Sequence, residues 1–414
     1  MTNQGKPSPF SAKLGDRELF PDLEPLVYAN HAAISPPSWP VRRAVQNAMV
    51  EWGRRGVGAF PVYAAQRARV REKLGKLIGA PVEDIGFVPN TTHGVSSIAL
   101  CFPWRRGDKV VVFEGEFPAN VTPWLRAAEL FGLEPIMLRV RDFAASDAQG
   151  LASLEGALSR GGVRLAAVSA VQFQTGLRMP LKEMATLLHA HGAELFVDGI
   201  QATGVLPIDV RDLGVDYWTA GGQKWLMGPE GTGFLYVRGE RAKELRPHLA
   251  GWLSHEDGVR FLLEGPGLMQ YDRPFKQRAD VFEGGGPNTL GLVGLEAAVD
   301  LIAEIGTEKI FEHVTAWLDG AEAGLVERGF TSLRAPEPSR RSGILGVVPP
   351  SDVDVVKLHR AIISRGVSCA IPDGVLRLSP HWPNNVDEVE QVLLTVDEAL
   401  ADARGIARPR SDDW

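Results

Sequence analysis

Cysteine is scarce in this chain. Only Cys101 and Cys369 occur among its 414 residues, and no Cys-x-x-Cys spacing is present. Two cysteines in a chain of this length exclude a disulfide scaffold and a cysteine-rich zinc site. The composition fits a reducing compartment, and we expect a cytoplasmic protein.

Long apolar runs and a surplus of positive charge are also absent. No stretch approaches the roughly 20 apolar residues of a membrane span, and residues 1–20 lack the apolar core of a signal peptide. The 44 basic and 51 acidic residues give a net charge of −7, which argues against nucleic-acid binding. We therefore expect no membrane and no nucleic-acid partner, but a small-molecule ligand.

The sequence does contain an alternation of apolar strands and helices. Apolar runs such as KVVVFE and AELFVD are spaced by helical stretches such as LKEMATLLHA. This pattern is typical of a parallel or mixed sheet covered on both faces. Because the chain is long enough for two domains, we expect an α/β fold with a large domain over 56–290 and a smaller α+β domain over 291–414. An N-terminal segment, 1–55, is expected to pack with the small domain.

Functional side chains follow the ends of several predicted strands. In open α/β sheets ligands bind at the carboxyl ends of the strands, so these residues are candidates for one shared site. They are Asn90, Thr91, Thr92, Phe117, Gln172, Asp198, Gln201 and, further along, Lys224. Each alone has an ordinary interpretation: asparagine and threonine cap helices, aspartate caps loops, and lysine lies in solvent.

Lys224 lies in the glycine-rich stretch AGGQKWLMGPEGTG, residues 220–233. Its amine, the Asp198 carboxylate, an anion site at the helix start at Thr92 and the aromatic Phe117 are the parts that hold pyridoxal 5′-phosphate (PLP). The glycines would let the backbone approach such a cofactor closely. A nucleotide-binding loop is disfavoured, because GPEGTG follows the lysine and precedes a strand rather than a helix.

The stretch VDGIQATGVLPIDVRDLGVDYWTAGGQKWLMGPEGTGFLYV, which begins at Val197, resembles the signature of class V aminotransferases. Its pattern is D-x-x-Q, then L-G-x-D, then a lysine followed by G-P-x-G-x-G-x-L-Y-V. Further matches run from NHAAISP to LRLSPHWPNNVDEVEQV, so the resemblance covers nearly the whole chain. It implies a fold type I PLP-dependent transferase, with a mostly parallel seven-stranded sheet in the large domain and a smaller α+β C-terminal domain.

The resemblance also implies roles for residues around the cofactor. Lys224 corresponds to the lysine that forms the Schiff base, Asp198 to the partner of the pyridine nitrogen, and Gln201 to the residue that bonds the phenolic oxygen. Phe117 falls where an aromatic ring stacks on the cofactor. We also expect Gln172 to bind the cofactor.

Phosphate and substrate contacts are implied in the same way. Thr92, with Thr91 beside it, corresponds to the phosphate-binding threonine, and Gln223 stands where many relatives have a phosphate-binding histidine. Gly286 lies in the stretch that reaches the neighbouring subunit's phosphate, which implies a homodimer with shared active sites. The residues expected to bind the amino-acid substrate are Arg377, which would hold its α-carboxylate, and Asn30 and His31.

Two departures from desulfurases bear on the reaction. Cys369 lies only eight residues before Arg377 in a predicted strand and tight turn, so the longer loop that carries the nucleophilic cysteine of desulfurases is missing. Phe117 stands where desulfurases have a histidine. We therefore expect aminotransferase-type or epimerase-type chemistry at the Cα of an α-amino acid. The alternative is a β-elimination (C–S) lyase or a cysteine desulfurase-like enzyme acting on a cysteine derivative, and a catalytically inactive binding protein is a remote third.

Overall fold

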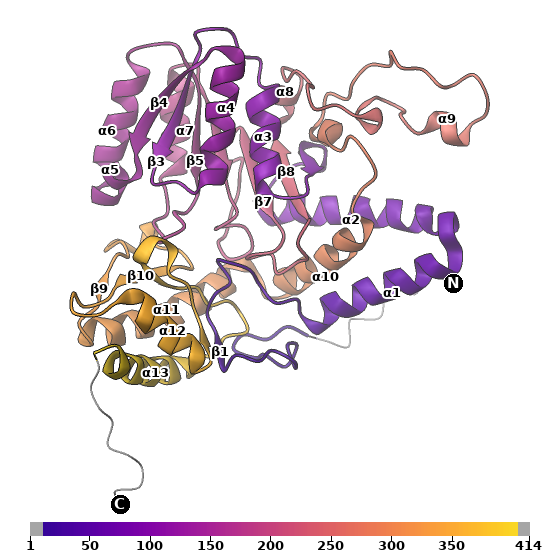
Figure 1. The fold of residues 1–414 in the computed structure, drawn as a ribbon. Coiled ribbons are helices and arrows are strands. Elements are labelled where there is room, and N and C mark those ends of the chain that lie inside the picture. The colour runs from indigo at the N-terminus through magenta and orange to yellow at the C-terminus, as the bar shows by residue number, and fades with distance from the viewer. Residues whose placement is uncertain (1–10, 405–414) are drawn as a thin grey trace, which may run out of the picture.

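Seven strands form a central sheet in the computed structural model, which describes residues 11–404 (Figure 1). The strand order is β2-β8-β7-β6-β5-β3-β4. β8 is antiparallel to both of its neighbours, and the other pairs are parallel. The predicted α/β fold with a mostly parallel seven-stranded sheet is confirmed. The strands are β2 (Ile85–Phe87), β3 (Lys109–Glu114), β4 (Glu134–Arg139), β5 (Val163–Ser169), β6 (Glu194–Asp198), β7 (Tyr217–Gly221) and β8 (Gly233–Val237).

Helices cover both faces of the sheet, because successive residues of a strand point to opposite sides. In β3, Val110 and Val112 pack in one apolar cluster with α3 (Thr91–Cys101) and α4 (Thr122–Phe131). Val111 and Phe113 pack in the other cluster. The second cluster includes residues of α5 (Val140–Ala145), α6 (Asp147–Leu158) and α7 (Leu181–Ala190). Burial on both faces accounts for the nearly continuous apolar strands of the sequence.

The C-terminal part builds a smaller sheet. β10 (Leu345–Val348) pairs antiparallel with β9 (Thr331–Ser332) and with β12 (Leu376–Leu378). The helices of this part lie together at one end of the molecule (Figure 1). They are α11 (Thr307–Glu327), α12 (Val355–Ser364) and α13 (Glu388–Ala403), and α10 (Thr289–Ile305) leads into them.

The N-terminal segment contacts two parts of the molecule. β1 (Val27–Tyr28) pairs in parallel with β11 (Val367–Ser368), which belongs to the C-terminal part. By contrast, α1 (Trp39–Arg55) packs against α10, as does α2 (Phe60–Ile78). The domain limits at 55 and 290 stay a prediction, and the outer limits at 1 and 414 lie outside the described residues.

A long excursion separates β8 from α10. The short α8 (Gly239–Ala242) follows β8, and the chain then reaches away from the body of the molecule through α9 (Arg260–Leu263) (Figure 1).

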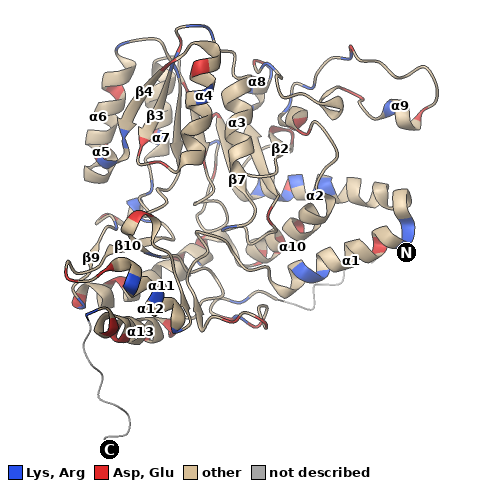
Figure 2. Ribbon diagram, viewed as in Figure 1, with Lys and Arg blue, Asp and Glu red and all other residues tan. Residues whose placement is uncertain are grey.

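Basic and acidic residues are interspersed along helices such as α2 (Figure 2). Within residues 11–404, no helix combines the length and the apolar character that crossing a membrane requires.

Gly204 lies where the turn after β6 meets the backbone next to Lys224. Its φ is 108°, and a Cβ at this position would lie 2.4 Å from the carbonyl oxygen of Trp225. Both the positive φ and the close backbone approach require glycine. Because Trp225 follows Lys224 directly, this contact helps to fix the position of the lysine.

Gly204→Ala is expected to lower the free energy of unfolding by at least about 2 kcal/mol, since the added methyl group meets backbone. Gly192→Ala is the matched control. Gly192 also has a positive φ, 70°, but no atom lies within 4 Å of the added Cβ, so we expect a loss of only about 1 kcal/mol. Urea unfolding followed by circular dichroism measures both, and equal losses would show that the approach to Trp225 carries no cost.

Candidate active site

Four predicted site segments meet at one edge of the sheet. β3 leads to Phe117, β6 ends at Asp198, and β7 leads to Lys224. β2, which precedes Thr91, runs in the same direction as β7 because both are antiparallel to β8. The carboxyl ends of strands that run in one direction share an edge, so the fold brings these residues to the same side.

The amine of Lys224 lies among aromatic and charged side chains. Its Nζ is 5.7 Å from the centre of the Phe117 ring. Burial lowers the pKa of Lys224 to about 8, with the charge of Asp198 raising this pKa and that of Arg377 lowering it. Such an amine is partly neutral at physiological pH, and the neutral form is the one that reacts with a carbonyl group.

Asp198 and Gln201 lie in and just after the end of β6. Asp198 is buried, and its Oδ1 accepts a hydrogen bond from the N–H of Ile200 at 3.0 Å. Burial raises the pKa of Asp198 to about 6, and a protonated pyridine nitrogen beside it would stabilise the charged form. Gln201 Nε2 donates to the carbonyl of Ala32, and its Oε1 accepts from Trp225 Nε1. The second amide hydrogen is left for a cofactor oxygen.

The start of α3 fits a phosphate group. Asn90 caps this helix by accepting from the N–H of His93 at 2.9 Å, which leaves both threonines for other partners. Thr91 Oγ1 is buried and has no hydrogen-bond partner within residues 11–404, and the same holds for Gln223 Oε1. Thr92 is exposed. A buried hydroxyl without a partner beside a helix N-terminus is what an anion site would leave when its ligand is removed.

Arg377 is a buried cation without a carboxylate. Its residue is 4% exposed, and Nη1 donates to the carbonyl of Phe173 at 2.8 Å. Nε has no hydrogen-bond partner, and no ion pair to Arg377 occurs in the described part of the chain. Burial lowers its pKa to about 10, so the guanidinium stays charged at neutral pH. An unpaired buried guanidinium is a fitting site for the α-carboxylate of a substrate.

His31 and Asn30, predicted to contact the substrate, have other partners. His31 is 1% exposed. Ser35 Oγ donates its only hydrogen to the carbonyl of Lys224 at 2.6 Å, so His31 Nδ1 donates to Ser35. Through Ser35, the ring supports the Lys224 backbone, and the substrate contact of His31 stays a prediction. Asn30 Nδ2 donates to the carbonyl of Cys369 at 3.4 Å.

Gln172, whose contact with the cofactor stays a prediction, binds neighbouring parts of the polypeptide. Its Nε2 donates to the carbonyl of Gly115 at 2.9 Å and to Gln174 Oε1. Its Oε1 accepts from the N–H groups of Gln174 and Thr175. Both ends of the carboxamide are thus engaged, and the structure offers no free group of Gln172 to a ligand.

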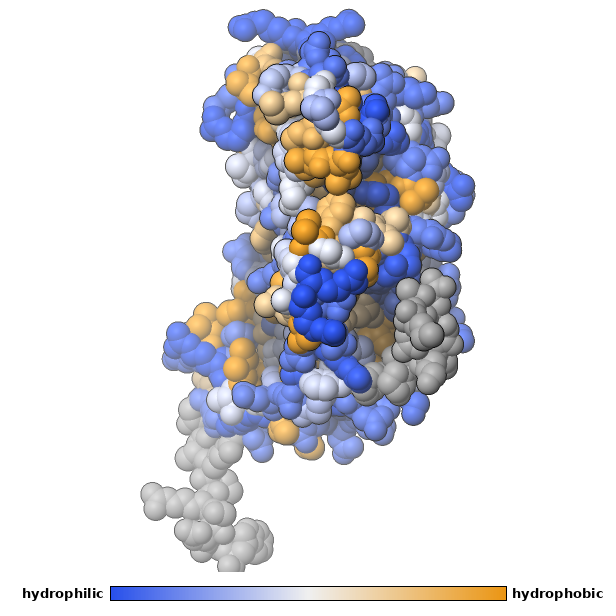
Figure 3. Space-filling model, turned by 90° about the vertical axis from the view of Figure 1, so that its right-hand side faces the viewer, coloured by the Kyte–Doolittle hydropathy of each residue, from blue (hydrophilic) through white to orange (hydrophobic). Residues whose placement is uncertain are grey.

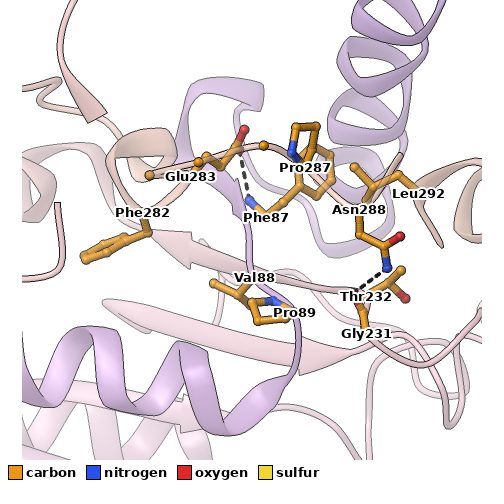
Figure 4. Close-up of a pocket in the computed structure, with 13 residues that line it drawn as sticks. Phe87, Val88, Pro89, Gly231, Thr232, Phe282, Glu283, Pro287, Asn288 and Leu292 are labelled. Carbon is orange, nitrogen blue, oxygen red and sulfur yellow. Dashed lines mark hydrogen bonds between the residues drawn. The ribbon is translucent and has the colours of Figure 1, made fainter. Parts of the chain in front are cut away.

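Gly286 lines a cavity that Lys224 does not share. This cavity of about 270 Å³ lies between residues 282–292 and the residues around Val88 and Thr232 (Figure 4). Asn288 Nδ2 donates to the carbonyl of Gly231 at 3.0 Å, next to the cavity. None of the residues near the Lys224 amine lines it. The contact of Gly286 with a neighbouring subunit's phosphate stays a prediction.

Two residues beside the site were missed in the sequence. Phe173 packs edge-on against Phe117, with ring centres 5.4 Å apart. The carboxyl group of Glu116 accepts from the N–H of Ser169 at 2.6 Å and from its hydroxyl. Glu116 lies two residues beyond the end of the apolar strand β3, and the argument that selected Asp198 at the end of β6 could have found it. A single aromatic such as Phe173 gives no comparable signal.

The family of this chain follows from a comparison with known proteins. A family model described as Aminotransferase class-V matches residues 45–392. The chain belongs to the class V aminotransferases. PLP is the cofactor of this family, and the amine, the carboxylate and the unpaired threonine described above fit it.

Several proteins similar to this chain are named for activity on sulfur compounds. A probable cysteine desulfurase of Pyrococcus abyssi is 28% identical over 94% of this chain and 98% of its own. A cysteine desulfurase of Dickeya dadantii is 32% identical over 73% of this chain and 72% of its own. The cystine C–S lyase C-DES, solved with its product cysteine persulfide, has a TM-score of 0.82 at 22% identity, over 91% of this chain and 98% of its own.

The pKa of Lys224 predicts how this class V enzyme takes up its cofactor. The rate at which Lys224 reacts with added PLP should rise with pH and level off above a pH of about 8. An exposed lysine would have a pKa near about 10.4. Asp198→Asn removes the charge that raises this pKa, so the midpoint should move to lower pH. The rate of change in visible absorbance after adding PLP to cofactor-free protein measures it. A midpoint near that of an exposed lysine would contradict the burial of this amine.

Proposed function

We propose that this chain is a PLP-dependent enzyme that breaks the Cβ–S bond of a cysteine derivative by β-elimination, without a protein thiol as acceptor. The relatives named as cysteine desulfurases support a sulfur-containing amino acid as substrate. They favour this reaction over the aminotransferase or epimerase chemistry expected from Phe117 and the missing cysteine loop. The observation that favours a lyase over a desulfurase is the burial of both cysteines.

Neither cysteine is placed to attack a substrate sulfur. Cys369 is 2% exposed, and burial raises the pKa of its thiol to about 12. Cys101 is fully buried in α3, and burial raises its pKa as well. A nucleophilic thiol must be accessible and ionised. Sulfur would therefore leave this site as a small molecule rather than as a persulfide on the protein.

The residues around Lys224 suit the proton transfers of such an elimination. Bound PLP supplies an electron sink for the substrate Cα. Lys224, largely neutral above a pH of about 8, can take the Cα proton. Arg377 would hold the α-carboxylate, and Asp198 would keep the pyridine nitrogen protonated. Phe117 would cover the ring, since it already lies over the amine.

We also propose that the enzyme works as a homodimer. The side that carries α9 and the α1–α2 turn shows apolar patches among hydrophilic residues (Figure 3). Large apolar residues exposed there include Trp52, Val57, Leu263, Met269 and Tyr271, with Val57 at 91% and Tyr271 at 84%. Exposed apolar area of this extent favours a protein partner. A second copy of the chain would cover it and bring Gly286 towards the neighbouring site.

The holoenzyme should convert cystine and water to pyruvate, ammonia and cysteine persulfide. One Cβ–S bond breaks, the leaving sulfur takes a proton, and water hydrolyses the remaining enamine. Cys101→Ser/Cys369→Ser should keep kcat/KM within about threefold of the wild type, because neither thiol takes part. Lys224→Ala should lose turnover and the visible absorbance of bound cofactor.

Product analysis separates the candidate reactions. Pyruvate from a panel of cysteine and cystine substrates supports elimination. Alanine with a persulfide on Cys369, lost in Cys369→Ser, would establish a desulfurase. A keto acid formed only with an amino acceptor, or exchange of the Cα hydrogen without bond cleavage, would restore the aminotransferase or epimerase interpretation.

Arg377→Ala should raise the KM for cystine at least about tenfold and leave cofactor absorbance unchanged, because the guanidinium faces substrate rather than PLP. Arg377→Lys keeps the positive charge but lacks the planar guanidinium. Its KM for cystine should therefore lie between those of the wild type and Arg377→Ala. Steady-state kinetics with spectra of each purified variant tests this. An unchanged KM in Arg377→Ala would place the substrate carboxylate elsewhere.

A further inference from the structure

The loop that carries Phe117 is tied at two points, to the last residue of β5 and to the segment that follows β5. Gln172 Nε2 donates to the carbonyl of Gly115 at 2.9 Å. Glu116 Oε1 accepts from the N–H of Ser169 at 2.6 Å, and Oε2 accepts from the Ser169 hydroxyl. Both ties lie within two residues of Phe117, and both hold a segment that would otherwise project from the end of β3.

The Phe117 ring has little packing of its own to hold it. The residue is 47% exposed, and Phe173 is its only ring neighbour among the described residues. A half-exposed aromatic with one edge-on contact retains rotamer and backbone freedom unless its main chain is fixed. The position of the ring over Lys224 therefore depends on the anchor beside it in the sequence.

The contact between Glu116 and Ser169 also lies next to Asp198, the residue proposed to bind the pyridine nitrogen. Ser169, which binds Glu116, is the residue opposite Asp198 in the β5–β6 pair, and the N–H of Ala170 donates to the Asp198 carbonyl at 2.8 Å. Glu116 is half-buried, and desolvation raises the pKa of its carboxyl group to about 7, with Ser169 lowering this pKa and Asp198 raising it further. One carboxyl group thus links the loop that carries Phe117 to the β5–β6 strand pair that carries Asp198.

We propose that Glu116 is a positioning residue that fixes Phe117 over the cofactor ring by binding Ser169. The inference rests on the cofactor position proposed above and is independent of which substrate bond is broken. Glu116→Gln keeps an oxygen for the Ser169 N–H and gains an N–H for the Ser169 oxygen, so the anchor survives. Glu116→Ala removes it.

The test uses the visible circular dichroism of PLP in the holoenzyme, which reports how asymmetrically the ring is held, together with pyruvate formation from cystine. Glu116→Ala should lower the visible dichroism at least about twofold and kcat about tenfold or more, with KM changed less than about threefold. Glu116→Gln should stay within about twofold of the wild type. Glu114→Gln, an exposed glutamate at the end of β3, is the matched control and should also stay within about twofold.

A double-mutant cycle shows whether Glu116 acts through Phe117. Adding Glu116→Ala to Phe117→Ala should cause no further loss of dichroism or kcat. Additive losses would overturn the proposal, as would wild-type dichroism and kcat in Glu116→Ala. Should Glu116→Ala fail to fold, Ser169→Ala replaces it: a smaller loss of dichroism is expected, and an unchanged signal overturns the proposal.

The outcome is separable from the proposed function. If Lys224→Ala retained the cofactor's visible band, the cofactor position itself would be wrong. If that band is lost in Lys224→Ala but Glu116→Ala behaves like the wild type, only the role of Glu116 fails. The dichroism measurement requires no turnover, so it decides the point even if cystine is not a substrate.

Discussion

The site depends on three charges that burial disfavours. Lys224 and Arg377 have pKa values lowered to about 8 and about 10, and that of Asp198 is raised to about 6. Desolvation is the largest cause in each case. Within the described chain Arg377 has no carboxylate partner. In the function proposed above, a substrate carboxylate would give Arg377 its opposite charge, and the protonated pyridine nitrogen of PLP would lie beside Asp198. The residues whose charges burial disfavours would then be the ones that bind the ligands.

The fold maintains this arrangement through contacts outside the site. Gly204 lets the turn after β6 approach the Trp225 backbone, and Ser35 donates to the carbonyl of Lys224 from the N-terminal segment. His31 holds Ser35 in turn. Segments from the large sheet and the N-terminus thus converge on the backbone of one lysine, which explains why a glycine-rich turn can present its amine at a defined position.

In this chain, the proposed elimination without a protein thiol rests on the hairpin before Arg377. Ala370 and Arg377 pair across it, and the turn between them includes Asp373 with a φ of 49°. So short a connection leaves Cys369 inside the protein, with its carbonyl bound by Asn30 and His359. The Cys369 thiol would have to leave these contacts to reach a substrate, whereas the elimination proposed above would need no such movement.

The sequence by itself determined the α/β fold, the cofactor and the pairing of Lys224 with Asp198, because apolar strand patterns and a local signature are short-range properties. The tertiary structure alone decided that β8 runs antiparallel, since an isolated apolar strand carries no direction. It also decided that Arg377 has no carboxylate partner among the described residues, that the His31 ring is buried against Ser35, and that Gln172 and Glu116 tie down a loop. Each of these side-chain contacts depends on which group, distant in the sequence, a polar side chain meets in the folded protein. Local sequence patterns do not encode such contacts.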